Sequence, residues 1–267
     1  MIHLYTLHFK YDYWVDLQVN SFKKHIKVPY KTYAIFSHMS QDIYEKRKNM
    51  YDHFEIRESG KSKHKGGNYH ATDGNRHIFP AIESNAKKGD IILRMDSDAF
   101  LIDDITQDFV DMVVDKKFIA LCEPQHEWDT TVVTPHPSFW SYPVEFLQQG
   151  LAEVMGAILE DSNSNWWGGV ERWLKNNDIE WTPITRSNKI NLHPLYYGIY
   201  NDLVYHHWAG SRNMITRADR KRAEKTGIDI EDIKKQNHEA SQQVIKQLNS
   251  QTKAFIDYLK GKEVELE

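Results

Sequence analysis

The sequence contains very little cysteine, with Cys122 the only one among 267 residues. A single thiol excludes an intrachain disulfide and a zinc site built from several cysteines. Long apolar runs are also missing, because none approaches the roughly 20 residues that a membrane-spanning helix needs. Residues 1–6 show no basic segment followed by an apolar stretch, so we expect no signal peptide, no membrane span and a cytoplasmic location.

Neither sign of charge dominates, since 34 Lys and Arg against 38 Asp and Glu leave a net charge of −4. Nucleic-acid-binding proteins usually carry a basic excess, so we expect no nucleic-acid partner. Aromatic residues and histidine are abundant instead, with 8 Trp, 14 Tyr, 11 Phe and 14 His. Aromatic rings stack on flat or sugar ligands, and they also fill protein cores.

The first 120 residues alternate apolar runs with stretches of helical periodicity. This pattern predicts strands at 2–9, 32–36, 54–56, 91–95 and 118–121, and helices at 13–26, 78–86 and 108–114. The polar, glycine-containing stretch 60–75 predicts a loop. Such an alternation indicates an α/β fold with a mixed, mainly parallel sheet flanked by helices, in which ligands bind at the carboxyl ends of the strands.

The rest of the chain is less regular. Residues 123–212 are rich in Trp, Pro and His, with helices expected within 142–155 and 169–176. We expect 1–215 to form the main domain and 216–267 a charged, helical C-terminal extension. One face of that extension is apolar, so it is predicted to dock on the domain or to form a homodimer, and to be dispensable for chemistry.

The sharpest local signal is Asp96-Ser97-Asp98, directly after the apolar strand 91–95. Residues i and i+2 of a strand share a face, so the two carboxylates would repel each other unless a cation lay between them. Oxygen ligands of this kind suit Mn²⁺ or Mg²⁺, with phosphates of a ligand completing the shell. The alternative interpretation is a solvated turn.

The segment Gly89–Phe100 resembles the DxD segment of GT-A glycosyltransferases. Two later segments resemble the W-G-G-E-D motif of inverting members, at Trp166–Arg172, and the late strand whose histidine completes the metal shell, at Val204–Ser211. The three occur in the order found in that family. The resemblance implies a GT-A (Rossmann-like) fold, a nucleotide-diphosphate sugar donor, a carbohydrate or glycoconjugate acceptor, and Mn²⁺ or Mg²⁺.

The resemblance also implies roles for individual residues. Asp98 would bind the metal directly, and Asp96 would reach it through water or bind the ribose of the nucleotide. His207 is the preferred third ligand because its spacing to Gly210 fits H-x-x-G, and His206 is the second choice. Adjacent strand residues face opposite sides, so only one of the two histidines is expected to point at the metal.

Glu171 would be the base of an inverting reaction, at the start of its helix. Arg172 replaces the second acid of the family motif, which leaves a retaining mechanism open. Weaker candidates are assigned to nucleotide or diphosphate binding or to sugar binding, with surface or core roles as the alternatives. The nucleotide candidates are Asp73, Arg76, Arg212, Arg94 and Lys65, and the sugar or acceptor candidates are Trp166, Trp167 and His136.

Two other functions compete with this interpretation. A sugar nucleotidyltransferase also places acidic metal ligands on an α/β sheet, but it needs a glycine-rich loop after the first strand. Residues 7–12 contain no glycine, which argues against that class. A non-catalytic carbohydrate-binding protein could use the tryptophans, but it requires neither the DxD nor the late histidine motif.

Overall fold

The computed structural model describes residues 1–10, 12–57, 67–122, 135–156, 166–193, 195–208, 215 and 217–266. The chain divides into two compact units, which we describe separately. The first consists of Met1–Ser97, Asp104–Leu121 and Pro135–Ile184. The second is built mainly from Asp98–Asp103 and Thr185–Glu267, so the predicted boundary between residues 215 and 216 falls inside it.

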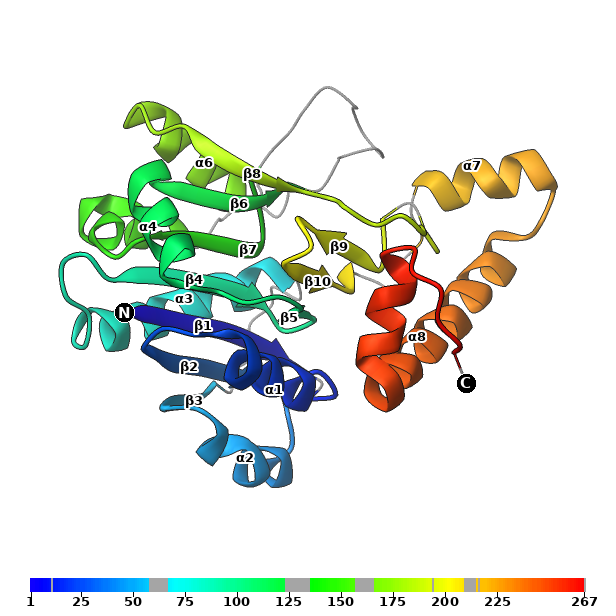
Figure 1. Cartoon of the computed structure of the whole chain (residues 1–267), viewed down its shortest axis with the longest axis horizontal. Coiled ribbons are helices and arrows are strands. Elements are labelled where there is room, and N and C mark those ends of the chain that lie inside the picture. Colours follow the sequence, from blue (N-terminus) through cyan, green and yellow to red (C-terminus); the bar gives the residue numbers. More distant parts are fainter. Residues whose placement is uncertain are drawn as a thin grey trace. The chain divides into compact units, whose positions relative to one another are not determined.

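A seven-stranded sheet with the order β3-β2-β1-β4-β7-β6-β8 forms the centre of the first unit (Figure 1). Strands β3, β2, β1 and β4 are parallel, and β7 runs antiparallel to β4. A mixed, mainly parallel sheet flanked by helices was predicted from the sequence and is confirmed. The strands are β1 Ile2–Phe9, β2 Tyr30–Ser37, β3 His53–Arg57, β4 Ile91–Asp96, β6 Phe118–Cys122, β7 Pro135–Pro143 and β8 Trp181–Thr185.

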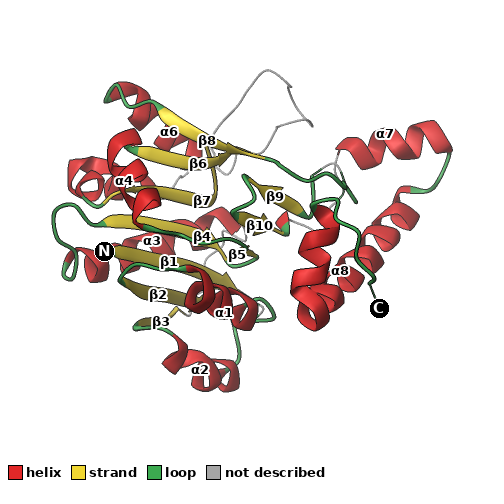
Figure 2. Cartoon of the chain, in the orientation of Figure 1, coloured by secondary structure: helices red, strands yellow, loops and turns green. Residues whose placement is uncertain are grey.

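Helices cover both faces of this sheet (Figure 2). Val15 and Val19 of α1 pack on Ala34 and Phe36 of β2, while the neighbouring Tyr33 points into the core cluster on the other face, with α3, α5 and α6. Alternate side chains of one buried strand therefore serve two cores. The helices are α1 Val15–His25, α2 Gln41–Arg47, α3 Gly67–Glu83, α4 Gln107–Lys116, α5 Ala152–Gly156 and α6 Trp166–Asn176, with a 3-10 turn at Lys48–Met50 and a π-helical turn at Leu147–Leu151.

Helix α3 begins at Gly67, so the loop predicted at 60–75 is wrong for residues 67–75, and the helix predicted at 78–86 is the end of a longer one. The polar residues that hide its periodicity have structural uses. Asn75 is fully buried and donates a hydrogen bond to the carbonyl of Met155, 3.0 Å away. Gly74 brings α3 against β1, because a Cβ there would lie 2.8 Å from the Leu7 side chain. Because these residues are polar or glycine, they interrupt the apolar periodicity of the helix, and the sequence therefore predicts a loop.

Two more boundaries differ from the prediction. The helix expected within 142–155 starts later, because β7 continues to Pro143 and the first helical turn begins at Leu147. Helix α6 starts at Trp166, three residues before the predicted start at Gly169. Within the described ranges, no helix combines the length and the apolar character that crossing a membrane requires.

The strand order reverses beside β1. The chain passes from β1 to β2 and β3 on one side and then returns to place β4 on the other side of β1. Leu7, near the end of β1, is the register partner of Asp96, the last residue of β4. Ligands of α/β sheets bind where the carboxyl ends of two such strands diverge. Asp96 therefore stands at the position of the sheet best suited to a ligand.

The second unit holds a three-stranded antiparallel sheet with the order β5-β10-β9, and two helices. These elements are β5 Ala99–Leu101, β9 Gly198–Tyr200, β10 Val204–His206, α7 Arg217–Thr226 and α8 Ile230–Leu259. The two helices confirm the predicted helical character of the C-terminal segment. The apolar stripe of α8 is buried in the single chain, so it is covered without a second copy.

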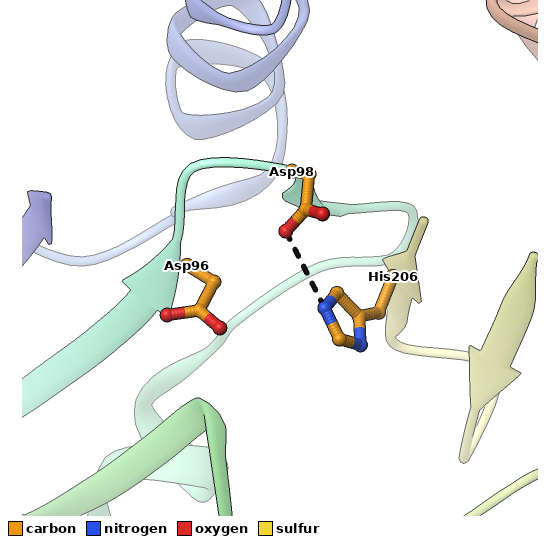
Figure 3. Close-up of side chains that lie close together, drawn as sticks. All are labelled: Asp96, Asp98 and His206. Carbon is orange, nitrogen blue, oxygen red and sulfur yellow. Dashed lines mark ion pairs between the residues drawn. The ribbon is translucent and has the colours of Figure 1, made fainter. Parts of the chain in front are cut away.

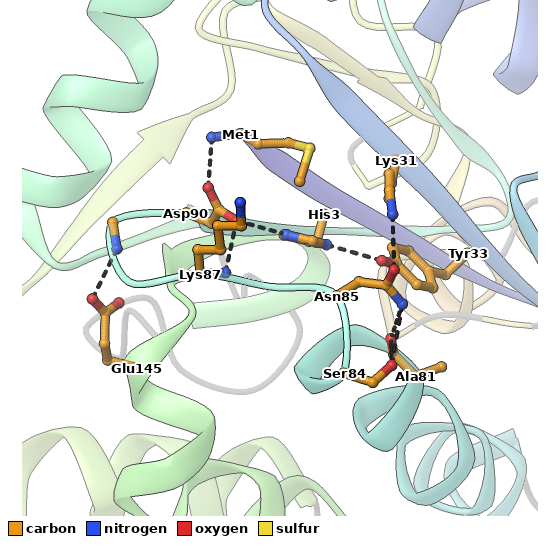
Figure 4. Close-up of polar contacts among 11 residues, drawn as sticks. Met1, His3, Lys31, Tyr33, Ala81, Ser84, Asn85, Lys87, Asp90 and Glu145 are labelled. Carbon is orange, nitrogen blue, oxygen red and sulfur yellow. Dashed lines mark hydrogen bonds and ion pairs between the residues drawn. The ribbon is translucent and has the colours of Figure 1, made fainter.

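Asp90, just before β4, lies at the centre of a group of hydrogen bonds (Figure 4). Its carboxylate accepts from the terminal ammonium of Met1 at 2.8 Å, from the N–H of Lys87 at 2.9 Å, and is bonded to Nε2 of His3 at 3.0 Å. The other ring nitrogen of His3 is bonded to the Tyr33 hydroxyl at 3.0 Å. Burial alone would raise the pKa of Asp90, but these hydrogen bonds together lower it.

We expect Asp90→Asn to lower the free energy of unfolding at pH 7 by about 2 kcal/mol, the usual effect of losing hydrogen bonds to a charged group. Because the pKa of Asp90 is lowered in the folded state, its contribution is complete above the unfolded value of about 3.9 and is lost as the pH falls through the folded value. Urea unfolding of both proteins from pH 7 to pH 3 should therefore show a difference that shrinks with acid. Asp115→Asn, with a side chain 73% exposed, is the control; a constant difference at every pH would contradict the prediction.

Candidate metal site

The two aspartates of the DxD segment flank a tight turn between two strands. Buried apolar residues carry β4 to Asp96, and β5 begins at Ala99 directly after Asp98. Gln18 of α1 donates a hydrogen bond of 2.8 Å to the carbonyl of Asp96, which holds the end of the strand. Asp96 is half-buried and Asp98 is only 5% exposed. A nearly buried carboxylate requires a compensating partner.

His206 supplies that partner for Asp98. Strand β10 runs antiparallel to β5 and pairs His206 with Ala99, which sets the imidazole beside the carboxylate. Nε2 of His206 lies 3.4 Å from Oδ1 of Asp98, and the two side chains point toward each other (Figure 3). With Asp96, two residues earlier in the chain, they offer three ligand atoms within 4.8 Å of one another. The predicted carboxylate pair is thus joined by a histidine.

The chemistry of this donor set fits a divalent cation. Two carboxylates near one another repel, and a cation among them removes the repulsion. Carboxylate oxygens suit Mg²⁺ and Mn²⁺, whereas imidazole is a ligand more typical of transition metals. The mixed set of Asp96, Asp98 and His206 therefore suits a divalent cation that accepts both oxygen and nitrogen ligands.

Arg94, also on β4, supports Asp96 from inside the protein. Its side chain is 3% exposed, and Nη2 lies 2.9 Å from Oδ1 of Asp96. The guanidinium also lies over the ring of Trp140, 5.7 Å from the centroid, which fixes its position. The sequence makes Arg94 a candidate for binding the diphosphate. The structure pairs it with Asp96 instead, where its charge offsets part of the repulsion between the carboxylates.

His207 points away from the aspartates. Its Nδ1 is hydrogen-bonded to the Tyr205 hydroxyl, and its Nε2 is hydrogen-bonded to Oγ of Ser241, both at 3.0 Å. Burial lowers the pKa of His207 to about 3 despite the nearby charge of Asp98, so the ring is neutral. One histidine faces the carboxylates, as expected, but it is His206. The preference for His207 drawn from the H-x-x-G spacing is reversed, because strand pairing decides which side chain faces β5.

We expect alanine at the two histidines to have different effects. His206→Ala removes a ligand and should weaken Mn²⁺ binding by at least about 10-fold, since even outer-shell changes cost about 10–100-fold. It also takes the buried Asp98 carboxylate's histidine partner away, so some loss of stability accompanies the loss of metal binding. His207→Ala leaves a buried cavity and two hydroxyls with a partner lost, and should lower the free energy of unfolding by about 3 kcal/mol. Mn²⁺ titration and urea unfolding of both variants check this. Equal, mild effects in both measurements would show that neither histidine has its assigned role.

The residues predicted to bind nucleotide have structural partners. Asp73 lies in α3 and pairs with Arg57 at 3.5 Å and with His77 at 3.7 Å. Arg76, one turn further, donates from Nε to the carbonyl of Gly156. His136, assigned to the acceptor, lies on β7 with Nδ1 2.7 Å from Oγ of Ser138. These contacts join parts of the first unit.

Glu171 is exposed on α6, five residues after the first residue of that helix, Trp166. It therefore does not stand at the helix start, as the sequence had indicated. Gly169 is explained by packing, because a Cβ there would lie 3.1 Å from the Val154 side chain of α5. Trp167 follows Trp166 in the first turn of α6. Arg212 and Lys65, together with the end of the late motif at 209–211, lie outside the described residues.

Sequence reasoning missed two supporting residues. Ser241 was read as part of a charged tail, although a serine on the buried stripe of an amphipathic helix signals a specific partner. Gln18 lies within the predicted helix 13–26, and no local pattern marks its side chain as buried. Both bind residues distant in the chain, so only the fold brings them to their partners.

Comparison with known proteins finds no protein-family model and no curated protein that matches the chain. The assignment of function therefore depends on the geometry of the Asp96, Asp98 and His206 group and on its place at the end of β4.

Proposed function

We propose that the protein is a metal-dependent glycosyltransferase of the GT-A type, which moves a sugar from a nucleotide-diphosphate donor to an acceptor hydroxyl. One observation carries this proposal: Asp96, Asp98 and His206 form a candidate metal-binding group where β4 ends, beside the reversal of strand order. The order of the three sequence motifs and the α/β sheet support it.

In this proposal each residue has a stated task. Asp98 and His206 bind the cation directly, and Asp96 contacts it directly or through water while Arg94 holds that carboxylate in place. A bound divalent cation would neutralise the negative charge that develops on the diphosphate as the glycosidic bond breaks. The buried strand β4 gives Asp96 a rigid base.

Thermal unfolding with UDP, GDP, CMP and TDP, each with and without Mn²⁺, tests the proposal. We expect one nucleotide to raise the melting temperature only when Mn²⁺ is present, because both must bind the folded state together. A screen of the corresponding nucleotide sugars should then show donor hydrolysis that stops in excess EDTA. Full activity in EDTA would overturn the proposal. A response to sugars alone would indicate a carbohydrate-binding protein, and formation of a nucleotide sugar from a sugar phosphate would indicate a nucleotidyltransferase.

Glu171 is proposed as the base of an inverting reaction. Glu171→Gln keeps the shape of the side chain and removes its basicity, so it should lower kcat by about 10²-fold and leave donor binding unchanged. The exposed Glu180→Gln is the matched control. NMR analysis of the product should show an inverted anomeric configuration; a retained configuration would remove Glu171 from this role whatever the rate of the variant.

A further inference from the structure

Helix α8 carries two polar side chains along its apolar stripe, the half-buried Asn237 and the fully buried Ser241. Ile233, Val244 and Leu248 are buried apolar residues at helical spacing, and Asn237 and Ser241 occupy the positions between them. Burying a polar side chain costs free energy unless it is hydrogen-bonded. Each of the two should therefore have a particular partner.

Both partners are buried and polar. Asn237 donates to Oδ1 of Asp219 in α7 at 3.0 Å, which joins the two helices. Ser241 is fully buried, and its hydroxyl lies 3.0 Å from Nε2 of His207. The first bond stays within the C-terminal helices. The second connects α8 to the end of β10, next to the candidate metal ligand His206.

The ring of His207 is held on several sides. The Tyr205 hydroxyl is bonded to Nδ1, and the Tyr197 ring packs against the imidazole with centroids 4.9 Å apart at 60°. Ser241 is bonded to the opposite edge of the ring, through Nε2. An imidazole that is hydrogen-bonded to a hydroxyl at each nitrogen has one fixed position, and the Ser241 hydroxyl makes that position depend on α8.

The backbone of His207 is also hydrogen-bonded to Asp98, so the position of His207 affects the position of Asp98. Its N–H donates to the carbonyl of Asp98 at 3.0 Å, while His206 pairs with Ala99 in the same ladder. The adjacent residues His206 and His207 therefore contact Asp98 in two ways. The N–H of His207 holds the Asp98 backbone, and the His206 imidazole lies 3.4 Å from the Asp98 carboxylate. A displacement of His207 would move both ligands relative to each other.

We propose that Ser241 is a positioning residue for the metal site, which sets His206 and Asp98 through its hydrogen bond to His207. This assigns α8 to the support of the site and departs from the expectation that the C-terminal segment is dispensable. The inference depends on the proposed function, because it requires that Asp98 and His206 bind a cation.

Mn²⁺ titration of the full chain, followed by the EPR signal of the free ion, tests the inference. Ser241→Ala should weaken Mn²⁺ binding by about 10-fold, the usual effect of losing an outer-shell partner. Ser241→Thr keeps the hydroxyl and should restore most of the affinity. Ser250→Ala is the control, because that serine lies exposed on the same helix and donates to the Lys246 carbonyl of its own turn. Melting temperatures ensure that each variant is measured folded.

The outcomes separate the two proposals. Wild-type protein that binds no Mn²⁺ would overturn the metal site and the role of Ser241 together. Binding by the wild type with an unchanged affinity in Ser241→Ala would overturn only the positioning role. Equal losses in Ser241→Ala and Ser241→Thr would also overturn it, because packing rather than the hydroxyl would then be responsible.

Discussion

Replacing Asp98 with asparagine is expected to reduce Mn²⁺ affinity by at least about 10²-fold and to abolish the metal-dependent binding of nucleotide. Asp98 is the most buried carboxylate of the candidate site, and its ion pair with His206 puts it at the centre of the ligand set. Asparagine has the same shape but no charge, and a neutral amide is a far weaker ligand for a hard cation. The loss of this one carboxylate ligand should therefore appear as a lower affinity for Mn²⁺.

The fold of Asp98→Asn should survive. Its backbone carbonyl still accepts from the N–H of His207, and the amide can still hydrogen-bond to His206. Circular dichroism and a melting temperature near that of the wild type provide the control, with Asp103→Asn as a matched change in the same unit. Mn²⁺-dependent nucleotide binding that persists in Asp98→Asn would show that the carboxylate pair is a solvated turn.

Truncation after Thr226, which removes α8, is expected to unfold the second unit and eliminate metal binding. The helix contributes buried apolar side chains at Ile233, Val244, Leu248, Phe255, Ile256 and Leu259. At about 1.5–3 kcal/mol for each buried side chain, their loss is on the order of 10 kcal/mol. The total stability of a protein is about 5–15 kcal/mol, so the remaining part of this unit should not stay folded.

Limited proteolysis and circular dichroism of the truncated chain measure this effect. Removal of residues 263–267 only is the control, because the described residues 263–266 lie beyond the end of α8 and none of them is buried. Turnover by a folded chain that ends at Thr226 would restore the view that the segment is dispensable.

Strands β1, β2, β4 and β6 of the central sheet were predictable because they are mostly buried on both faces. The run Ile2–Phe9 was predicted as a strand and is one over the same residues. The apolar residues of β4 and the polar Asp96 after them also placed the carboxylates at the end of a strand. Continuous apolar runs with polar ends are typical of parallel strands, and they need no tertiary information to be recognised.

The rest of the site depends on contacts that local patterns do not contain. His206 and His207 are adjacent, and only the pairing of β10 with β5 decides which ring meets Asp98. The role of Ser241 requires a contact across 34 positions of sequence. Gly169 belongs to the W-G-G-E-D resemblance, and its close packing against the Val154 side chain is a contact that the motif does not describe. The spacing of a motif identifies candidate residues, but the residues that contact them come from distant segments of the chain.

The burial of Cys122 at the end of β6 has a practical consequence for following the motions of the sheet. A thiol reagent can reach this side chain only when the protein around it opens, and no second thiol contributes to the signal. When closing is faster than labelling, the labelling rate gives the free energy of that opening. Cys122 is therefore a natural probe of local unfolding. Comparing the labelling rate of Cys122 with and without Mn²⁺ would show whether metal binding makes local opening around β6 less frequent.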